Sequence, residues 1–387
     1  MDTDFHGYFY LCISVSIRGS FSYDSNIDFH NIRQACSQLS SDFMHRFQLT
    51  NQFLLSRNIL LATFAVLIIS TAGQFNLNAA ELPKLTKMTF QSSLDNSTQP
   101  ALIWIPPKAM QEPTPLFIFL HSWSGDYKQN NNVWFAQAVA RNWIYLHPNF
   151  RGRNDNPAAC GSELARQDIL DCIQQVIDST EVDTSRVYLA GSSGGGHMSM
   201  LMAGYYPDRF SAVSAWVGIS DLAEWYRFHS RGGKPSNYAR MVQASTQGIP
   251  GQSPEADAQY KARSPIFHIQ NVGDLPLDLN TGIHDGHTGS VPIVHTINAF
   301  NKIAQEKQAP LISPEEIETL SNEQPLSNPQ SSDIVPVTEY DTRIYLRRQA
   351  GETRITVFEG GHESLPLPAC RWLSKQDRKT DWVKSKE

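Results

Sequence analysis

Apolar runs and amphipathic stretches alternate along this chain from about Leu85 onward. Five runs have the length and the apolar content of buried strands, and they cover residues 116–120, 143–146, 187–190, 212–217 and 354–358. Four stretches between them have helical spacing, at residues 132–140, 162–177, 195–205 and 294–305. Strands that alternate with helices are typical of an α/β fold. The pattern therefore predicts a mostly parallel sheet with helices on both faces, over residues 85–387.

Two segments interrupt this alternation. Residues 225–262 combine Gly, Pro, Ser and Gln with several aromatic side chains, and we expect an insertion that caps a site. Its aromatic side chains either line a substrate pocket or pack beneath the segment, and they are Trp225, Tyr226, Phe228 and Tyr238. Residues 310–336 include SNEQPLSNPQSSD, which predicts a mobile surface loop.

The apolar run ILLATFAVLIISTAG, at residues 59–73, lies upstream of this domain. It follows Arg57, precedes small residues that end at Ala80, and is shorter than the roughly 18 residues that span a bilayer. This layout predicts a signal peptide at residues 44–80, with an uncleaved anchor or a buried helix as the alternative. Because signal peptides begin at the N-terminus, we expect Met44 to be the true start and residues 1–43 a mis-assigned extension. The mature protein would be exported, periplasmic or extracellular, with no stable membrane insertion.

Charge and cysteine content narrow the possible classes of function. The 387 residues carry a formal net charge of -6 without a cluster of Lys and Arg, so we expect no nucleic-acid partner. Only Cys160, Cys172 and Cys370 follow residue 80, and an odd count is no disulfide framework. Cys160 and Cys172 could pair, but Cys172 lies on the apolar stripe of a predicted helix, which favours a buried thiol.

The clearest chemical motif is GSSGG, at residues 191–195, between a predicted strand and a predicted helix. It matches GxSxG, in which the middle serine stands on a turn too tight for flanking side chains, so Ser193 is the predicted nucleophile. Taking Ser192 instead would place Ala190 and Gly194 at the flanks, a poorer match. A flexible linker would have polar flanks, and a phosphate-binding loop would continue with GK and Ser or Thr. Neither pattern occurs here.

An acyl-transfer nucleophile needs backbone donors for the oxyanion that forms beside it. The N–H of Gly194 begins the predicted helix and is directed toward the turn, so it is one predicted donor. The second should come from the loop after the strand at 116–120, where Trp123 is our candidate and simple packing is its alternative role. His121 in the same loop could be a base, but we expect it to brace the loop.

A serine nucleophile also needs a histidine base and an orienting carboxylate, and in such folds the chain order is Ser, Asp or Glu, His. His362 follows a predicted strand and a Gly-Gly pair, at the end where loops carry active sites. Asp274, Asp278 and Asp285 are the candidate acids. Alternating leucines place Asp278 inside a strand and Asp274 at its entry. Because only Asp285 falls on the loop after that strand, we predict that it orients His362, which takes the proton of Ser193.

The same acid loop contains two further histidines, His284 and His287. A histidine pair could indicate a metal site, but no third ligand stands at a recognisable spacing. We therefore expect these rings to shape the loop, and we predict no metal and no cofactor.

Five segments carry a family resemblance: LHSWSGDY, VYLAGSSGGGHMSMLMAGYYPDRFSAVSA, YKARSPI, TGIHDGHTGSVP and FEGGHE. With them the chain resembles the α/β hydrolase superfamily, and in particular the catalytic domain of the prolyl oligopeptidase family (S9) of serine peptidases and its related esterases. The resemblance extends from about Leu85 to the C-terminus. It implies an α/β hydrolase fold with an inserted cap and the triad Ser193, Asp285 and His362. The early loop departs from the family's peptidases, which commonly supply a tyrosine donor there, and is closer to that of esterases.

Together these residues predict an exported serine hydrolase that cleaves a peptide or carboxylic ester bond through an acyl-enzyme. The substrate is a peptide, a small-molecule ester or an acyl ester of a glycan, and the residues do not separate these possibilities. From a different class, the alternative is an inactive binding protein on a hydrolase fold.

Overall fold

The computed structural model of the chain describes residues 82–385. The predicted signal peptide at residues 44–80, the start at Met44 and the extension at residues 1–43 lie outside the described residues. Within residues 82–385, no helix is both long enough and apolar enough to cross a membrane.

A 9-stranded sheet organises this part of the chain, in the order β1-β2-β4-β3-β5-β6-β7-β9-β8. The strands are β1 (Thr86–Gln91), β2 (Thr98–Trp104), β3 (Thr114–Leu120), β4 (Ile144–Pro148), β5 (Val182–Ser192), β6 (Ala212–Trp216), β7 (Leu277–Gly282), β8 (Ile344–Ala350) and β9 (Thr353–Phe358). The six strands from β4 to β9 in that order run parallel, whereas β1, β2 and β8 pair antiparallel at the edges. The predicted mostly parallel sheet is confirmed, and the five predicted strands correspond to β3, β4, β5, β6 and β9.

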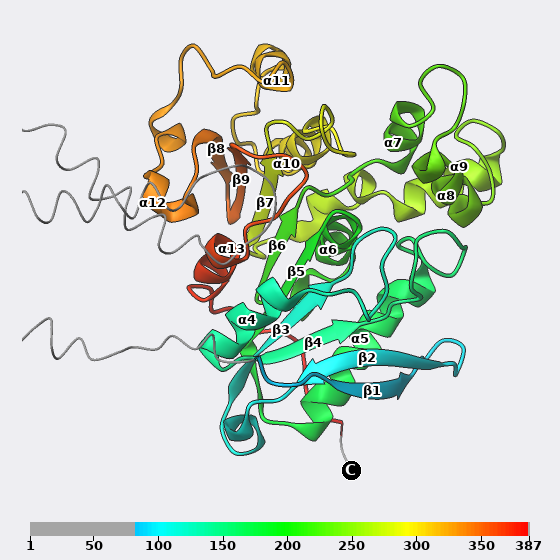
Figure 1. The fold of residues 1–387 in the computed structure, drawn as a ribbon, viewed down its shortest axis with the longest axis vertical. Helices are drawn as coiled ribbons and strands as arrows, with labels where there is room; N and C mark the ends of the chain where they lie inside the picture. Colours follow the sequence, from blue (N-terminus) through cyan, green and yellow to red (C-terminus); the bar gives the residue numbers. More distant parts are fainter. Residues whose placement is uncertain (1–81, 386–387) are drawn as a thin grey trace, which may run out of the picture. The chain divides into compact units, whose positions relative to one another are not determined.

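Helices cover both faces of the sheet (Figure 1). They are α4 (Asn132–Arg141), α5 (Glu163–Ser179), α6 (Gly194–Tyr205), α10 (Val294–Glu306) and α13 (Pro366–Leu373). Apolar side chains of α5, α6 and α10 pack in one core with Ile118 and Leu189, while those of α4 and α13 pack in another with Phe117 and Tyr188. Successive strand residues thus face opposite cores, which explains why β3 is buried along its whole length.

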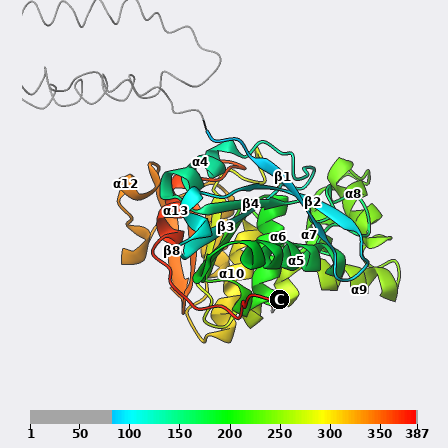
Figure 2. The same cartoon turned by 90° about the horizontal axis from the view of Figure 1, so that it is seen from below.

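The segment between β6 and β7 is helical, with α7 (Leu222–Phe228), α8 (Asn237–Thr246) and α9 (Pro254–Arg263). Figures 1 and 2 both show these three helices grouped at one side of the sheet, away from α12. They share a small apolar core that includes Trp225, Val242 and Tyr260, and that core also contains Trp123 from the loop after β3. The expected insertion therefore packs directly on the loop that holds the second candidate donor.

The segment at residues 310–336 contains α11 (Pro314–Ser321), so the expected loop is not a loop along its whole length. Ser313 caps this helix through its hydroxyl, and Glu316 returns the contact to the Ser313 backbone. The composition did not reveal this capping box, because the Ser, Asn and Pro content of the segment suggests a loop. The remaining short elements are α12 (Val337–Tyr340), η1 (Pro107–Met110), η2 (Pro207–Arg209), η3 (Pro265–Phe267), η4 (Ile269–Val272) and η5 (Ser331–Asp333).

Candidate active site

Ser193 stands on a strained turn between β5 and α6, at the carboxyl edge of the parallel strands. Its φ of 58° and ψ of -116° lie in a region that residues other than glycine rarely adopt. A Cβ on Gly191 would collide with the Gly195 backbone, and a Cβ on Gly195 would collide with the Leu120 carbonyl. Glycine at both positions therefore allows the strand, the turn and the helix to approach this closely.

The predicted serine, histidine and carboxylate come from three loops that lie side by side. Ser193 follows β5, Asp285 follows β7 and His362 follows β9, and the parallel pairing of β5 through β9 brings these loops to one edge. His362 Nε2 lies 2.9 Å from Ser193 Oγ, and His362 Nδ1 lies 2.7 Å from Asp285 Oδ2. Because an ionised carboxylate only accepts hydrogen bonds, Nδ1–H donates to Asp285 and leaves Nε2 to accept the serine proton.

The Asp285 carboxylate is fully buried and is held on both oxygens. Oδ1 accepts hydrogen bonds from the backbone N–H groups of Gly286 at 3.0 Å and Val291 at 3.1 Å, while Oδ2 faces His362. A Cβ on Gly289 would collide with this carboxylate, so the loop can close around Asp285 only with glycine at that position.

The two other candidate acids lie elsewhere. Asp278 is buried inside β7, where its carboxylate binds Arg354 Nε at 2.6 Å and accepts the Ser214 hydroxyl at 2.9 Å. Asp274 is exposed and pairs with Lys307. Neither contacts His362, so the structure brings Asp285 alone of the three to the histidine.

The backbones of Trp123 and Gly194 lie against each other beside Ser193. A Cβ on Gly194 would collide with the Trp123 amide nitrogen. Within residues 82–385, neither N–H donates to an acceptor. The Trp123 indole is buried against Trp225, with the two ring centroids 4.6 Å apart. The side chain of Trp123 therefore packs against the inserted helices, while its backbone N–H remains available to an oxyanion.

His121 braces this loop, as expected, rather than approaching Ser193. Its Nε2 lies 2.7 Å from the Asn149 carbonyl, and its ring stacks on Phe150 with centroids 3.7 Å apart. Burial lowers the pKa of His121 and favours the neutral ring, whose single N–H can donate to one carbonyl.

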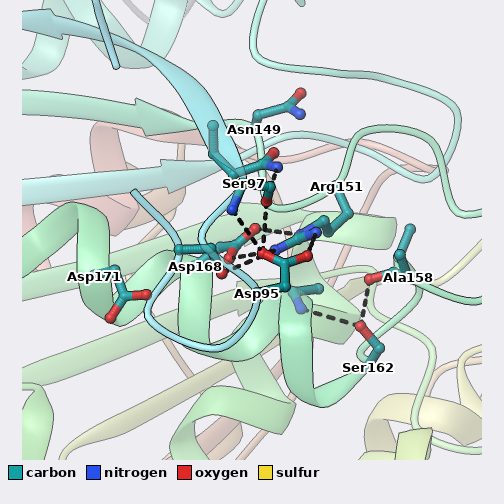
Figure 3. A network of polar contacts seen from close by, with 12 residues as sticks. Asp95, Ser97, Asn149, Arg151, Ala158, Ser162, Asp168 and Asp171 are labelled. Atoms are coloured by element: carbon teal, nitrogen blue, oxygen red, sulfur yellow. Dashed lines mark hydrogen bonds and ion pairs between the residues drawn. The ribbon is translucent and has the colours of Figure 1, made fainter. Parts of the chain in front are cut away.

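The segment after β4 that supports His121 is itself fixed by Arg151 (Figure 3). Arg151 Nε lies 2.5 Å from Asp168 Oδ2, and its Nη1 lies 2.7 Å from Asp95 Oδ2. Phe150 and Arg151 both have positive φ, at 33° and 74°. The ion pairs therefore hold a strained stretch of backbone that presents Asn149 and Phe150 to His121.

A chain of side-chain amides holds the same loop from its other side. Gln129 Oε1 accepts both the backbone N–H and the hydroxyl of Ser122 at 2.9 Å, and Gln129 Nε2 donates to Asn131 Oδ1. Asn131 Nδ2 in turn lies 3.2 Å from His147 Nε2, whose ring donates from Nδ1 to the Phe119 carbonyl. Burial lowers the pKa of His147 to about 4, which leaves the neutral ring that this pattern needs. No local sequence signal marks Gln129 or Asn131, because their partners become visible only in the folded chain.

Replacing Gln129 with leucine is expected to lower kcat about tenfold, because the Ser122–Trp123 backbone loses its anchor beside the oxyanion position. Hydrolysis of p-nitrophenyl acetate gives the readout. Asn130→Ala is the control, since the exposed Asn130 contacts only the Asn132 backbone. Equal kcat in the two variants would contradict this role of Gln129.

A pocket of about 340 Å³ opens at Ser193 and His362. Its other lining residues are neutral, and they are Phe119, Ser122, Trp123, Ser124, Gln129, Asn131, Val133, Trp134, Ser192, Tyr238 and Ser364. Of the aromatic residues noted in the inserted segment, only Tyr238 reaches this pocket. Trp225 and Tyr226 are buried in the core of the inserted helices, and Phe228 lines a separate pocket with Arg227 and Arg231. The other aromatic residues of the wall come from β3, the loop after it and α4.

Within the described residues, no group of three or more His, Cys, Asp or Glu side chains is arranged to hold a metal ion. His284 contacts two glutamates, and His287 Nε2 contacts the Ser321 carbonyl. The three cysteines of this part of the chain are free and buried, so the possible Cys160–Cys172 pair does not form.

Comparison with known proteins gives a family match and several relatives. Residues 130–313 match the prolyl oligopeptidase family. The chain is 28% identical over 150 residues to an acylamino-acid-releasing enzyme of Arabidopsis thaliana, which covers 35% of this chain and 20% of that protein. It is 28% identical over 126 residues to a feruloyl esterase B of Talaromyces funiculosus, which covers 30% of this chain and 35% of that protein. The chain thus spans well under half the length of these curated relatives.

A solved structure with the same fold is the acylaminoacyl peptidase of Pyrococcus horikoshii. It superposes with a TM-score of 0.53 at 15% identity, over 80% of this chain and 44% of that one. The fold, the family match and the relatives lead to one conclusion. The chain has an α/β hydrolase fold, and over residues 130–313 it resembles the prolyl oligopeptidase family.

Proposed function

We propose that this protein cleaves peptide or carboxylic ester bonds by acyl transfer to Ser193. The observation that carries the proposal is the continuous contact from Asp285 through His362 to Ser193, at 2.7 and 2.9 Å. Two unpaired N–H groups of described residues, on Trp123 and Gly194, lie beside the serine. These are the parts that a serine hydrolase requires.

In the proposed reaction, His362 Nε2 takes the Ser193 proton as Oγ attacks the substrate carbonyl carbon. Asp285 keeps Nδ1 protonated and stabilises the resulting imidazolium. The tetrahedral oxyanion accepts hydrogen bonds from the N–H groups of Trp123 and Gly194. Collapse breaks the bond to the leaving group, which takes the proton from His362. Water then repeats the sequence on the acyl-enzyme, releasing the acid and restoring Ser193.

The lining of the pocket supports an uncharged group next to the scissile carbonyl. None of its side chains is Asp, Glu, Lys or Arg, so a charged group placed there would lose water without gaining an ion pair. Trp134, Tyr238 and Val133 offer apolar and aromatic contact instead. An aromatic acyl ester and an acylated amino acid, the substrate types suggested by the names of the relatives, both present an uncharged acyl group.

A fluorophosphonate probe tests the proposed nucleophile. The wild-type protein is expected to be labelled covalently, Ser193→Ala should not be labelled, and Ser192→Ala should still be labelled because it keeps the nucleophile. Labelling of Ser193→Ala at the wild-type rate would refute the assignment. Absence of labelling in all three proteins would favour the inactive binding protein instead.

A matched pair of esters tests the uncharged pocket. p-Nitrophenyl butyrate and mono-p-nitrophenyl succinate share a leaving group and have acyl chains of similar length, but only the succinate ends in a carboxylate. The butyrate should have a kcat/KM at least about tenfold higher, because the pocket offers the carboxylate no cation. Methyl ferulate and N-acetyl amino acid anilides, assayed alongside, separate ester from peptide chemistry. Equal values for the butyrate and succinate would contradict the neutral pocket.

A further inference from the structure

A second contact joins the two loops that carry Asp285 and His362. His284, the residue before Asp285, has a carboxylate at each ring nitrogen. Its Nδ1 lies 2.9 Å from Glu323 Oε1, and its Nε2 lies 2.6 Å from Glu359 Oε1. Glu323 follows α11, while Glu359 follows β9 and stands three residues before His362. One ring thus ties the acid loop both to the histidine loop and to the end of α11.

This arrangement fixes the charge of the ring. A neutral imidazole has one N–H, whereas two ionised carboxylates can only accept. Both contacts are satisfied only if His284 carries a proton on each nitrogen. The hydrogen bonds to Glu323 and then to Glu359 raise the pKa of His284, in agreement with that geometry. The two carboxylates lie at different ring nitrogens, so they do not converge with His284 on a common metal position.

The backbone already brings these loops together. His284 N–H donates to the Gly360 carbonyl at 3.0 Å, and Ile283 N–H donates to the Phe358 carbonyl at 2.9 Å. A Cβ on Gly282 would collide with the Gly360 and Gly361 carbonyls. At such close range, a small shift of either loop changes the distance between Asp285 and His362, and displacements of about 1 Å can cost about a hundredfold in rate.

We propose that His284 is a positioning residue. As an imidazolium between Glu323 and Glu359, it holds the loop of Asp285 and the loop of His362 at the distance that the Asp285–His362 contact requires. The inference rests on the proposed function, since it concerns the same triad. His284 does not contact Ser193 or His362, and it acts through the loops that place Asp285 and His362.

We call the contacts of His284 with Glu323 and Glu359 the clamp. The clamp is pH-dependent because it needs the charged ring. The groups that face it are Glu323 at the end of α11, Glu359 at the end of β9, and Tyr345 on β8, whose hydroxyl donates to Glu359 Oε2 at 2.5 Å. Arg343, which precedes β8, stacks on the Tyr345 ring at 4.6 Å. The pKa of His284 is raised, so its contribution is complete below the ordinary histidine pKa and is lost as pH rises through the raised value. The clamp therefore weakens as pH rises, at higher pH than an ordinary histidine would lose its proton.

Labelling rate and turnover in three variants test the clamp. His284→Ala is expected to lower kcat for p-nitrophenyl acetate about tenfold, with KM within about twofold, and to slow fluorophosphonate labelling in parallel. His287→Ala, on the same loop but with a ring that bonds only to the Ser321 carbonyl, should stay within about twofold of wild type. Glu359→Gln keeps an acceptor for the ring but removes one charge. Its alkaline loss of kcat should therefore begin at lower pH than in the wild type.

Nitrogen-15 NMR of labelled histidines measures the protonation of both ring nitrogens directly. A His284→Asn variant assigns the His284 signals. Two protonated nitrogens on His284 at pH 7 are expected, and a single protonated nitrogen would overturn the proposal. It would also be overturned if His284→Ala and His287→Ala had the same kcat and pH profile in a protein that is labelled at Ser193. If the wild type is not labelled at all, the proposed function fails, and the positioning role of His284 fails with it. The NMR result then still decides whether the charged clamp exists.

Discussion

Replacing Asp285 with asparagine is expected to lower kcat by about 10⁴-fold while the fold is retained. Asparagine has nearly the same shape as aspartate, so the loop from Gly286 to Val291 can keep its course. The amide cannot stabilise the His362 imidazolium, and its NH₂ group favours the ring tautomer that lacks a proton on Nδ1. That tautomer carries its proton on Nε2, the atom that must accept from Ser193. Esterase turnover, together with circular dichroism to verify folding, measures the effect.

Asp278→Asn is the matched control, since Asp278 is the other buried aspartate on the same strand and loop. Its carboxylate pairs with Arg354 and accepts the Ser214 hydroxyl, away from His362. This variant should keep kcat near the wild-type value but lower the free energy of unfolding by roughly 3 kcal/mol, because Arg354 loses its buried partner. A greater loss of kcat in Asp278→Asn than in Asp285→Asn would overturn the assignment of the acid.

Replacing Arg151 with methionine is expected to lower the free energy of unfolding by about 3–5 kcal/mol. The Arg151 guanidinium binds both Asp95 and Asp168, and the Asp168 side chain is completely buried. Removing the arginine leaves that carboxylate without a cation and without water. Methionine retains much of the apolar stem, so the loss reports the ion pairs rather than the packing. Urea unfolding followed by tryptophan fluorescence gives the difference in free energy.

The double variant Arg151→Met, Asp168→Asn separates the cost of the unpaired Asp168 charge from the loss of the backbone support that Arg151 gives. Asparagine removes the buried charge, so the double variant should recover part of the stability that the single variant loses. Because Arg151 also holds the backbone that supports His121, the double variant should still have reduced kcat even with its stability partly restored. If the double variant were less stable than Arg151→Met alone, the unpaired Asp168 charge could not be the cause of the loss.

Local sequence signals predicted much of this fold. The apolar runs in β3 and β5 are short and continuous, so they indicate buried strands without knowledge of their partners. The GxSxG turn is equally local, because its glycines are needed within five consecutive residues. The prediction of a loop at residues 310–336 missed α11, because this helix is short and depends on its capping box, which composition does not reveal.

The sequence alone determined the strands, the helices between them and the candidate chemistry, with Ser193 on its turn and His362 after a strand. The sequence also predicted Asp285 as the acid, but only the tertiary structure gave the contacts, since His362 meets a serine 169 positions away and this aspartate 77 positions away. It also supplied the partners that no pattern signals, including the amide of Gln129 and the two glutamates around His284. The physical reason is that these contacts depend on strand order. Parallel pairing brings distant loops to one edge, where distances of about 3 Å assign the role of each side chain.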